Sequence, residues 1–533
     1  MAKYIFVTGG VVSGLGKGIT AASLGRLLIN RGLKVTVQKL DPYLNVDPGT
    51  MNPCEHGEVF VTDDGTETDL DIGHYERFLG RSLNKTSSYT SGKIYSSVIS
   101  KERKGDYLGK TIQIVPHVTN MIIEKMQSVA HGEDIVIVEI GGTVGDIEGM
   151  VYMEALRQFR KRLGPNNSLS IHVTLIPYLK SSGEIKTKPT QASVKELSQM
   201  GISADIVVCR TDEDITLDQY TREKIAMFCN LDSPDHVIHN KDCASIYQVP
   251  ILLKEQKLDD LILQKLKLKA PKDSLSDWKD MVKQMLIKHE STKNIAIVGK
   301  YTHVSDSYIS VTEAIKHATL ANSIGVTIKL VDSEQIQTDG TEKHLANFDA
   351  ILIPGGFGNR GIEGKILAAQ YARENNIPFL GICLGMQIAT IEFARNVANI
   401  TDAHSTEFQS NTKNPVIHIM EDQKYIENLG GTMRLGLYDC TTTPGSKTHR
   451  LYGKPLIKER HRHRFEFNNA YKSQLTSAGL LISGINEQNN LVEIIEIPSH
   501  PFYVAAQFHP EFLSRPYDPH PLFVGLIKSI IEA

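Results

Sequence analysis

The chain has 533 residues, which is long enough for roughly two to four domains with well-buried cores. Its 58 Lys and Arg against 61 Asp and Glu give a net charge of −3, and 41% of its residues are hydrophobic. This composition is typical of a globular protein. It argues against a disordered chain, a protein that binds nucleic acid polymers over a broad surface and a membrane-surface protein.

Six cysteines are scattered along the chain without a C-x-x-C pair, at positions 54, 209, 229, 243, 383 and 440. This spacing argues against a disulfide framework and a structural zinc site, and it fits a reducing compartment. The apolar residues near the start run directly into a glycine-rich turn, so we interpret them as a buried strand and not as a signal peptide. Since no stretch reaches the roughly 18 apolar residues of a spanning helix, we expect a cytoplasmic protein without a membrane partner.

The first predicted strand, residues 4–8, leads into a glycine-rich loop and then into a predicted helix over residues 18–30. In such a loop, backbone N–H groups and the helix N-terminus can hold phosphate oxygens, and Lys17 can reach the outer phosphates of a nucleotide. The standard phosphate-loop pattern is not met, because Gly18 stands where a magnesium-binding Ser or Thr is expected. The alternative interpretation is an ordinary glycine-rich turn between a strand and a helix.

Two acidic residues could supply the magnesium ligands that the loop lacks. Glu139 ends a predicted strand over residues 135–140 that is otherwise apolar. A charge there is costly unless it is paired or bound to a metal, and ligands of open α/β sheets bind at the carboxyl ends of strands. Asp71 belongs to an acidic cluster in a polar loop. The alternatives are a helix-capping carboxylate for Glu139 and an ordinary surface loop for Asp71.

A basic loop follows the predicted strand over residues 172–177 and precedes the one over residues 206–209. Its lysines, threonines and glutamine lie on a segment that a proline stiffens, and they could bind a second polyanion. These residues are Lys186, Thr187, Lys188, Pro189, Thr190 and Gln191. Since charged loops are usually only solvated, this loop indicates a second nucleotide only in combination with the phosphate loop.

The alternation of short apolar strands and helices changes character between residues 268 and 293, where a proline and a polar run predict a surface connection. A second series of strands follows, over residues 295–298, 327–331, 350–354 and 378–382. We therefore predict an α/β protein of two domains, each a mainly parallel sheet flanked by helices. The predicted boundaries are 1–267 for a phosphate-loop or Rossmann-like domain, 268–293 for a linker and 294–533 for the second domain.

The second domain carries a candidate nucleophile. Cys383 lies in the pattern G-x-C-x-G between a predicted strand and a predicted helix, which is the thiol counterpart of the serine nucleophile elbow. The helix N-terminus favours a thiolate, and His509 and Glu511, which would share one face of a strand, could act as base and orienting carboxylate. Backbone N–H groups of residues 352–358 and of Leu384 could form an oxyanion hole. The alternative for Cys383 is a buried packing residue.

These motifs resemble those of known enzyme families. The elbow, the Pro-Gly-Gly-Phe-Gly loop and the Phe-His-Pro-Glu string are similar to those of a class I glutamine amidotransferase. The first half of the chain resembles the synthetase domain of the CTP synthase family, and the matching strings cover nearly the whole chain in family order. These strings are residues 11–18, 39–43, 47–51, 56–61, 141–148, 186–191, 354–358, 381–387, 460–464 and 508–511.

The resemblance implies a set of ligand contacts. ATP would bind Gly14, Leu15, Gly16, Lys17, Gly18, Ile19 and Asp71, and would lie near Lys241, Asp242 and Cys243. Asp71 and Glu139 would hold Mg²⁺. UTP would bind Ser13, the six residues of the basic loop and Lys224, and CTP would share its triphosphate site but turn its base towards Asp146, Ile147 and Glu148. Glutamine would bind Gly356, Leu384, Gly385, Met386, Gln387, Glu407 and Arg464.

The function that the resemblance implies is the ATP-dependent amination of UTP to CTP with ammonia from glutamine, the last step of de novo pyrimidine nucleotide synthesis. It also implies GTP as an activator, CTP as a feedback inhibitor and a homotetramer formed as a dimer of dimers. One alternative is another glutamine-dependent ATP amidoligase, such as a cofactor-diamide synthetase. The other is a phosphate-loop switch ATPase that carries an idle amidotransferase domain.

Overall fold

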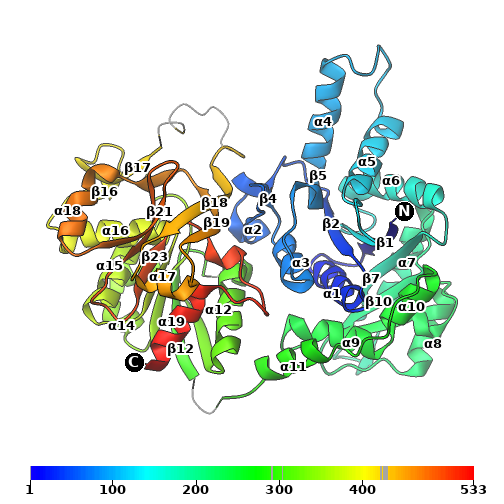
Figure 1. Ribbon diagram of the computed structural model, residues 1–533. Helices are drawn as coiled ribbons and strands as arrows, with labels where there is room; N and C mark the ends of the chain where they lie inside the picture. The colour runs from blue at the N-terminus through cyan, green and yellow to red at the C-terminus, as the bar shows by residue number, and fades with distance from the viewer. Residues whose placement is uncertain (1, 290–291, 303, 421–422, 424–429, 533) are drawn as a thin grey trace. The chain divides into compact units, whose positions relative to one another are not determined.

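The computed structural model describes the chain except for residues 1, 290–291, 303, 421–422, 424–429 and 533. The chain folds into two compact units, whose elements are labelled in Figure 1. Unit 1 comprises Met1–Asp47 and Asp71–Leu286, and unit 2 comprises Pro48–Leu70 and Ile287–Ala533. Residues 48–70 therefore fold with the C-terminal half of the sequence, although they belong to its N-terminal half. Residues 290–291 of the predicted linker lie outside the described residues.

Unit 1 is built on a sheet of seven strands in the order β11-β10-β7-β1-β6-β2-β5, and all of its neighbouring strands are parallel. The strands are β1 (Lys3–Gly9), β2 (Val35–Asp41), β5 (Ser88–Thr90), β6 (Ile135–Ile140), β7 (Ser168–Leu175), β10 (Ile206–Thr211) and β11 (Val237–Lys241). Most of their residues are buried on both faces, as expected for a parallel sheet that helices cover on two sides. The predicted parallel sheet of the first half is confirmed.

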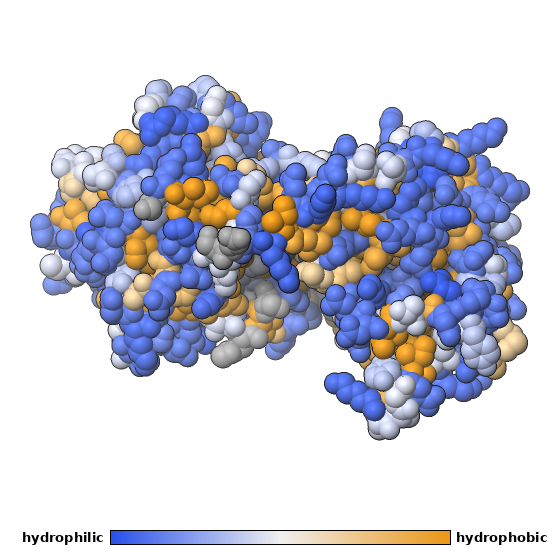
Figure 2. Space-filling model, turned by 90° about the horizontal axis from the view of Figure 1, so that it is seen from below, coloured by the Kyte–Doolittle hydropathy of each residue, from blue (hydrophilic) through white to orange (hydrophobic). Residues whose placement is uncertain are grey.

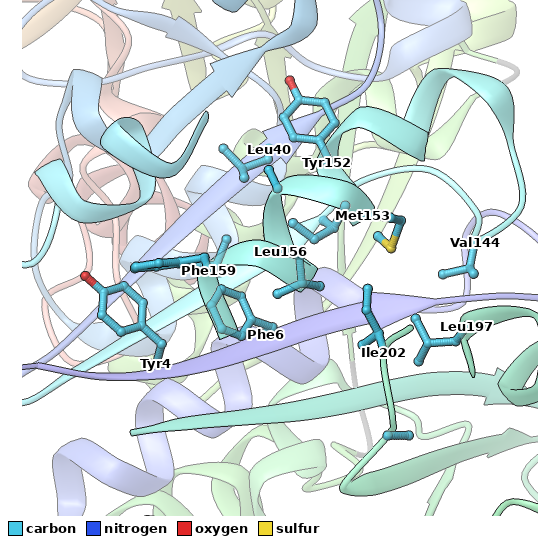
Figure 3. Packing of buried hydrophobic residues seen from close by; sticks show 14 of the residues in the cluster. Tyr4, Phe6, Leu40, Val144, Tyr152, Met153, Leu156, Phe159, Leu197 and Ile202 are labelled. Atoms are coloured by element: carbon cyan, nitrogen blue, oxygen red, sulfur yellow. The ribbon is translucent and has the colours of Figure 1, made fainter. Parts of the chain in front are cut away.

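Helices cover both faces of this sheet (Figure 1). The helices of unit 1 are α1 (Lys17–Asn30), α3 (Asp71–Leu79), α4 (Ser91–Arg103), α5 (Thr119–Ser128), α6 (Met150–Leu163), α7 (Lys188–Gln199), α8 (Gln219–Phe228), α9 (Val249–Glu255), α10 (Leu258–Lys265) and α11 (Ser276–Met285), of which α4 extends beyond the sheet. Figure 3 shows one face, where Tyr4 and Phe6 of β1 meet Phe159 of α6 edge-on, with ring centroids 4.9 and 6.0 Å apart. Such alternate residues of one strand anchor the helical layer. A strand pair, β8 (Tyr178–Leu179) and β9 (Glu184–Ile185), precedes the basic loop.

The segment between the two predicted domains contains helix α11 and packs within unit 1. Trp278, Met281 and Val282 are buried, as the apolar stripe in the sequence predicts. The Trp278 indole donates a hydrogen bond to the Tyr247 carbonyl at 2.7 Å and packs against Phe78. Helix α11 therefore adds to the core of unit 1.

Unit 2 contains a sheet of nine strands in the order β13-β12-β14-β15-β23-β22-β21-β18-β19. The strands are β12 (Thr292–Gly299), β13 (Gly325–Asp332), β14 (Ala350–Ile353), β15 (Phe379–Ile382), β18 (Arg434–Thr442), β19 (Leu456–His463), β21 (Leu481–Asn486), β22 (Leu491–Glu496) and β23 (Tyr503–Ala506). The first five strands in this order are parallel and the remainder are antiparallel. The α/β prediction is confirmed, and this second sheet is mixed.

Smaller elements complete unit 2. A three-stranded sheet contains β16 (Ala403–Ser405), β17 (Asn414–Ile419) and β20 (Phe465–Phe467), and a strand pair contains β3 (Phe60–Val61) and β4 (Glu67–Thr68). The helices are α2 (Pro53–His56), α12 (Ile309–Asn322), α13 (Ser333–Asp339), α14 (Thr341–Leu345), α15 (Ile362–Glu374), α16 (Leu384–Asn396), α17 (Lys447–Tyr452), α18 (Lys472–Ser477) and α19 (Pro521–Glu532). Helices α15 and α16 follow the central parallel strands β14 and β15 in the chain.

The surface seen in Figure 2 is mostly hydrophilic, with hydrophobic areas interspersed between the charged side chains. In the part of the chain that the structure describes, no helix combines the length and the apolar character needed to cross a membrane.

Candidate functional site

Cys383 lies at the turn between β15 and α16 in unit 2. Its backbone angles are φ 51° and ψ −101°, a strained conformation for a residue other than glycine. The flanking glycines permit the turn, because a Cβ atom on Gly381 would lie 2.7 Å from the Gly385 carbonyl oxygen, and one on Gly385 would collide with the Ile353 carbonyl. The Cys383 N–H donates to the Ala506 carbonyl at 2.7 Å, which ties the turn to β23. The turn therefore has the geometry of a nucleophile elbow.

His509 and Glu511 form a buried pair beside this elbow. Nδ1 of His509 lies 2.7 Å from Oε1 of Glu511. Burial disfavours the charged imidazole, but the Glu511 carboxylate and the Cys383 sulfur outweigh it and raise the pKa of His509 to about 10. The other ring nitrogen, Nε2, is buried without a hydrogen-bond partner among the described residues. Nε2 is therefore the ring nitrogen that can exchange a proton with a reacting group.

The expectation that His509 and Glu511 share one face of a strand is wrong. Strand β23 ends at Ala506, and Glu511 lies in a short 3-10 helix, Pro510–Phe512. Pro510 has no N–H group to continue a ladder, and its fixed φ favours a turn at this point. The turn brings Glu511 back towards His509, whose ring stacks on Phe512 with centroids 4.9 Å apart.

The loop after β14 lies against the same histidine. A Cβ atom on Gly355 would lie 2.7 Å from Cε1 of His509, so only a glycine allows the backbone to come this close. The Gly358 N–H donates to Oε1 of Glu407 at 2.8 Å, and the Lys300 ammonium donates to the Phe357 carbonyl. Burial raises the pKa of Glu407, although the Gly358 N–H and Lys300 oppose that shift. The peptide group between Phe357 and Gly358 is thus held at its carbonyl and at its N–H by charged side chains.

The residues predicted to bind glutamine include the first turn of α16, whose side chains point into the core, and Arg464, which directly follows β19. The side chains of Leu384, Met386 and Gln387, at the start of α16, are buried, and Gln387 Nε2 donates to the Phe465 carbonyl at 3.1 Å. The first turn of the helix can therefore offer backbone N–H groups rather than side chains. Arg464 donates to Gln423 Oε1 and Thr432 Oγ1, each at 2.8 Å.

A cavity of about 710 Å³ in unit 2 contains the three residues of the predicted triad. The motif residues of the second predicted domain that line it are Pro354, Gly355, Gly356, Phe357, Cys383, Arg462, Arg464, His509 and Glu511. Segment 48–70, which belongs to the first domain of the sequence prediction, contributes the stretch from Gly49 to Cys54, together with Glu58 and Val59. The cavity encloses enough space for a small substrate.

Ion pairs between distant parts of the sequence hold segment 48–70 in unit 2. Arg460 Nε lies 2.6 Å from Oδ1 of Asp63, and Arg462 Nε lies 2.8 Å from Oε1 of Glu67. Arg460 is fully buried, so it requires a carboxylate partner. The sequence shows the alternating arginines of β19 and the acidic residues after β3. Which arginine pairs with which carboxylate becomes visible only in the folded chain.

The phosphate loop of unit 1 lies between β1 and α1. Gly14 and Gly16 have φ angles of 73° and 79°, in the left-handed region that glycine favours. Lys17 is buried at the start of α1, and its ammonium donates to the Gly142 carbonyl at 2.7 Å. Burial lowers the pKa of Lys17, against the attraction of Glu139. The loop therefore combines a helix N-terminus with a buried lysine, as a phosphate site requires.

The two predicted magnesium ligands approach the same ammonium group. Lys39 lies opposite Glu139 in the register of β2 and β6. Its Nζ atom is 3.7 Å from Glu139 Oε1 and 3.7 Å from Asp41 Oδ1, and it pairs more closely with Asp71. Burial raises the pKa of Glu139, and the charge of Lys39 opposes that shift. Asp71 and Glu139 thus offer hard oxygen donors at one point, which suits Mg²⁺.

A closed metal site is not formed by the protein alone. Among the residues that the structure describes, no three His, Cys, Asp or Glu side chains converge into a ligand set. This fits Mg²⁺, which usually takes one or two carboxylates and completes its shell with phosphates and water.

The basic loop runs into the N-terminus of α7. Lys188 is exposed at the first position of this helix, and Lys186 pairs with Glu184. Thr190 is buried and donates to the Leu175 carbonyl at 3.0 Å, and Gln191 Nε2 donates to Thr187 Oγ1 at 3.0 Å. The threonines and the glutamine thus fix the loop, and the lysines reach the surface.

The remaining predicted nucleotide contacts lie mostly at the surface of unit 1. Lys241 ends β11, Asp242 pairs with Arg210, and burial raises the pKa of Cys243. The exposed residues are Ser13, Asp146, Ile147, Glu148 and Lys224.

Comparison with known proteins gives matches over both halves of the chain. The family described as "CTP synthase N-terminus" matches residues 3–268, and "Glutamine amidotransferase class-I" matches residues 303–529. The CTP synthase of Latilactobacillus sakei subsp. sakei is 57% identical over 530 residues, which cover 99% of each chain. That of Carboxydothermus hydrogenoformans is 57% identical over 535 residues, covering 100% of this chain and 99% of the relative. The solved glutaminase domain of Trypanosoma brucei CTPS with bound acivicin is 40% identical, covers 45% of this chain and 94% of that domain, and has a TM-score of 0.43.

Proposed function

The chain belongs to the CTP synthase family, and from this premise we propose how its residues divide the reaction between two sites. It is a ligase that converts UTP to CTP in an ATP-dependent reaction, with ammonia that its glutamine amidotransferase activity releases. We assign the amination to a synthetase domain over residues 1–267 and glutamine hydrolysis to residues 294–533, joined by the linker 268–293. Residues 48–70 serve the hydrolysis site, since they line its cavity.

The two alternative functions fit these comparisons less well. Another amidoligase or a switch ATPase would share only part of the chain with CTP synthases. Relatives that are 57% identical over the full length argue against both.

In the proposed hydrolysis, Cys383 Sγ attacks the amide carbon of glutamine. The thiol proton moves to Nε2 of His509 and then to the leaving nitrogen, so ammonia departs and a thioester remains. Water, which gives a proton to His509, cleaves the thioester to glutamate, and His509 returns that proton to the sulfur. Glu511 holds the imidazole through Nδ1, 2.7 Å away, and stabilises its charged form.

The contacts with glutamine follow from the charges around the cavity. Backbone N–H groups of Gly356 and Leu384 receive the oxyanion that forms on the amide oxygen. The Glu407 carboxylate suits the substrate's α-ammonium group, and the Arg464 guanidinium suits its α-carboxylate. Gly385, Met386 and Gln387 contribute the first turn of α16, whose side chains are buried.

In the proposed amination, the phosphate loop holds ATP. Backbone N–H groups from Gly14 to Ile19 bind its phosphates, and Lys17 offsets charge on the phosphoryl group in transfer. The uracil 4-oxygen attacks the γ-phosphorus and ADP leaves; ammonia then displaces phosphate at C4 and gives CTP. Asp71 and Glu139 would hold Mg²⁺, which when bound offsets negative charge on phosphate oxygens. We also assign Lys241, Asp242 and Cys243 to the contacts with ATP.

UTP and CTP share the lysines of the basic loop in this proposal. The triphosphate binds Ser13, Lys224 and residues 186–191, where the N-terminus of α7 adds favourable partial charge. CTP turns its base towards Asp146, Ile147 and Glu148 and inhibits the enzyme. GTP activates glutamine hydrolysis.

We propose a homotetramer, and exposed apolar side chains on unit 1 support it. Leu108 is 89% exposed and Ile147 is 84% exposed, and three neighbours in the elements from α4 to α6 share this character. These neighbours are Ile99, Ile114 and Met150. Apolar side chains exposed in this way are typical of a surface that another subunit covers. A cytoplasmic location stays a prediction from the sequence.

One observation carries this assignment: Cys383, His509 and Glu511 line one cavity, in a chain whose other unit has a phosphate loop beside Asp71 and Glu139. The test uses the full chain with UTP, ATP and Mg²⁺, and follows the ultraviolet change as UTP becomes CTP. We expect CTP with either glutamine or ammonium, and loss of only the glutamine-driven reaction after iodoacetamide treatment that glutamine prevents. Loss of both reactions through alkylation at Cys383 would contradict the assignment of two sites.

A further inference from the structure

Lys365, in the first turn of α15, is a buried lysine that none of the sequence motifs includes. The residue is only 1% exposed, and the charged groups that act on its ammonium are Lys300, Arg360, Glu407 and Asp332. A Cβ atom on Gly356 would lie 4.0 Å from its Nζ. The ammonium therefore lies behind the loop whose backbone faces the Cys383 cavity.

The charges around Lys365 disfavour its protonated form. Burial and the nearby Lys300 and Arg360 lower the pKa of Lys365 to about 7, although Glu407 and Asp332 oppose them. The N-terminal end of α15 also carries a partial positive charge that disfavours a cation in its first turn. Near neutral pH, Lys365 therefore exchanges between its charged and neutral forms.

Stability alone does not explain a lysine at this position. An ammonium on a side chain that is only 1% exposed and lies near two other cations is costly, and an apolar side chain of similar length would fill the space without that cost. A negative charge that arises only during the reaction would compensate for it. Such a charge is expected on the far side of the loop, where the amide oxygen of glutamine becomes an oxyanion.

We propose that Lys365 is a positioning residue of the glutamine site, whose ammonium stabilises the oxyanion from behind the Gly356 peptide. This inference rests on the proposed hydrolysis of glutamine by Cys383. Lys365 does not touch the substrate. Its positive charge acts electrostatically on the oxyanion across the Gly355–Gly358 loop. The oxyanion in turn favours the proton on Lys365, so the addition step is fastest where Lys365 is protonated.

The test compares kcat/KM for glutamine hydrolysis in the wild type, Lys365→Met and Lys365→Arg from about pH 6 to about pH 9. At about pH 6, we expect Lys365→Met to be about tenfold slower than the wild type. This ratio should approach one as the pH rises, because the wild type loses its own charge above about pH 7. Lys365→Arg keeps its charge, so its ratio to Lys365→Met should stay constant across the range.

Two further measurements separate this role from others. Alkylation of Cys383 by iodoacetamide forms no oxyanion, so its rate should be equal in the wild type and Lys365→Met. The Tm of Lys365→Met should be equal to that of the wild type or higher, since a buried charge is removed. A kcat/KM ratio that is constant with pH, a lower Tm or slower alkylation would overturn the proposal. Glutamine hydrolysis that survives in Cys383→Ala would instead overturn the proposed function itself.

Discussion

The Asp71 carboxylate lies directly against Gly18 of the phosphate loop, where a side chain on residue 18 would collide with Asp71 Oδ1. In a standard phosphate loop, a Ser or Thr hydroxyl at this position binds magnesium. Here the first residue of α3 brings a carboxylate to the place of that hydroxyl. The Asp71 carboxylate therefore takes the place of the hydroxyl that the motif lacks at Gly18. It can lie this close to the loop only because Gly18 has no side chain.

Gly18→Ala should displace the Asp71 carboxylate and weaken the use of Mg²⁺. We expect ammonia-driven CTP synthesis to fall about tenfold or more at low Mg²⁺ and to recover in part at high Mg²⁺. The measurement is the Mg²⁺ dependence of CTP formation with ammonium. Gly149→Ala is a matched control, because its new Cβ would meet only the Thr143 carbonyl, at 3.9 Å. Equal Mg²⁺ dependence in the two variants would refute the role of this contact.

Lys39→Met should increase the affinity of unit 1 for a divalent cation without nucleotide. The Lys39 ammonium neutralises Asp71, Asp41 and Glu139, so its removal leaves three carboxylates to attract a cation. We expect Mn²⁺ to bind about tenfold more tightly, measured by electron paramagnetic resonance of free Mn²⁺. Lys39→Arg retains the charge and should bind as the wild type does. Unchanged binding in Lys39→Met would show that Lys39 does not compete with the metal.

Glu511→Gln should slow glutamine hydrolysis by about a hundredfold or more, because the neutral amide no longer stabilises the His509 imidazolium. It should also change stability in a pH-dependent way. The pKa of His509 is raised from 6.5 to about 10, so its contribution to stability is complete below pH 6.5 and is lost as the pH rises to about 10. The Tm difference between wild type and variant should therefore be larger at about pH 6 than at about pH 10. The same difference at both values would contradict this electrostatic account.

Gly355→Ala should disturb the base without affecting the synthetase site. The new Cβ would press on Cε1 of His509 from 2.7 Å and rotate the ring. We expect kcat for glutamine hydrolysis to fall about tenfold, while ammonia-driven CTP synthesis stays at the wild-type rate in the same preparation. Steady-state kinetics with each nitrogen source provide the comparison. A proportional loss of both reactions would point to a folding defect.

The parts of the two sites that could be predicted from the sequence are those formed by residues close together in the chain. The phosphate loop around Lys17 and the turn at Cys383 each combine a strand, small residues and a helix within one short stretch, so the pattern itself determines the geometry. The spacing of His509 and Glu511 correctly suggested a pair, but the strand that was expected to align them ends at Ala506, and Glu511 lies in the short helix that Pro510 begins. The pair forms through a turn instead.

What the sequence could not show depends on distant contacts. Arg462 pairs with Glu67, although 395 positions separate them, so no linear pattern identifies residues 48–70 as part of the cavity. Lys365 resembles an ordinary surface lysine until the packing of α15 buries it. Strands β18 and β19 mix buried residues with partly exposed ones, so neither forms the apolar run by which the parallel strands were predicted.

The most direct measurement of the two-site account compares glutamine-driven and ammonia-driven CTP synthesis in Cys383→Ala and in Lys17→Ala. We predict that Cys383→Ala loses the glutamine-driven reaction and keeps the ammonia-driven one, because only the nucleophile of unit 2 is missing. Lys17→Ala should lose both, because each requires the phosphoryl transfer of unit 1. The account would be contradicted if Cys383→Ala lost both reactions, or if Lys17→Ala kept ammonia-driven synthesis.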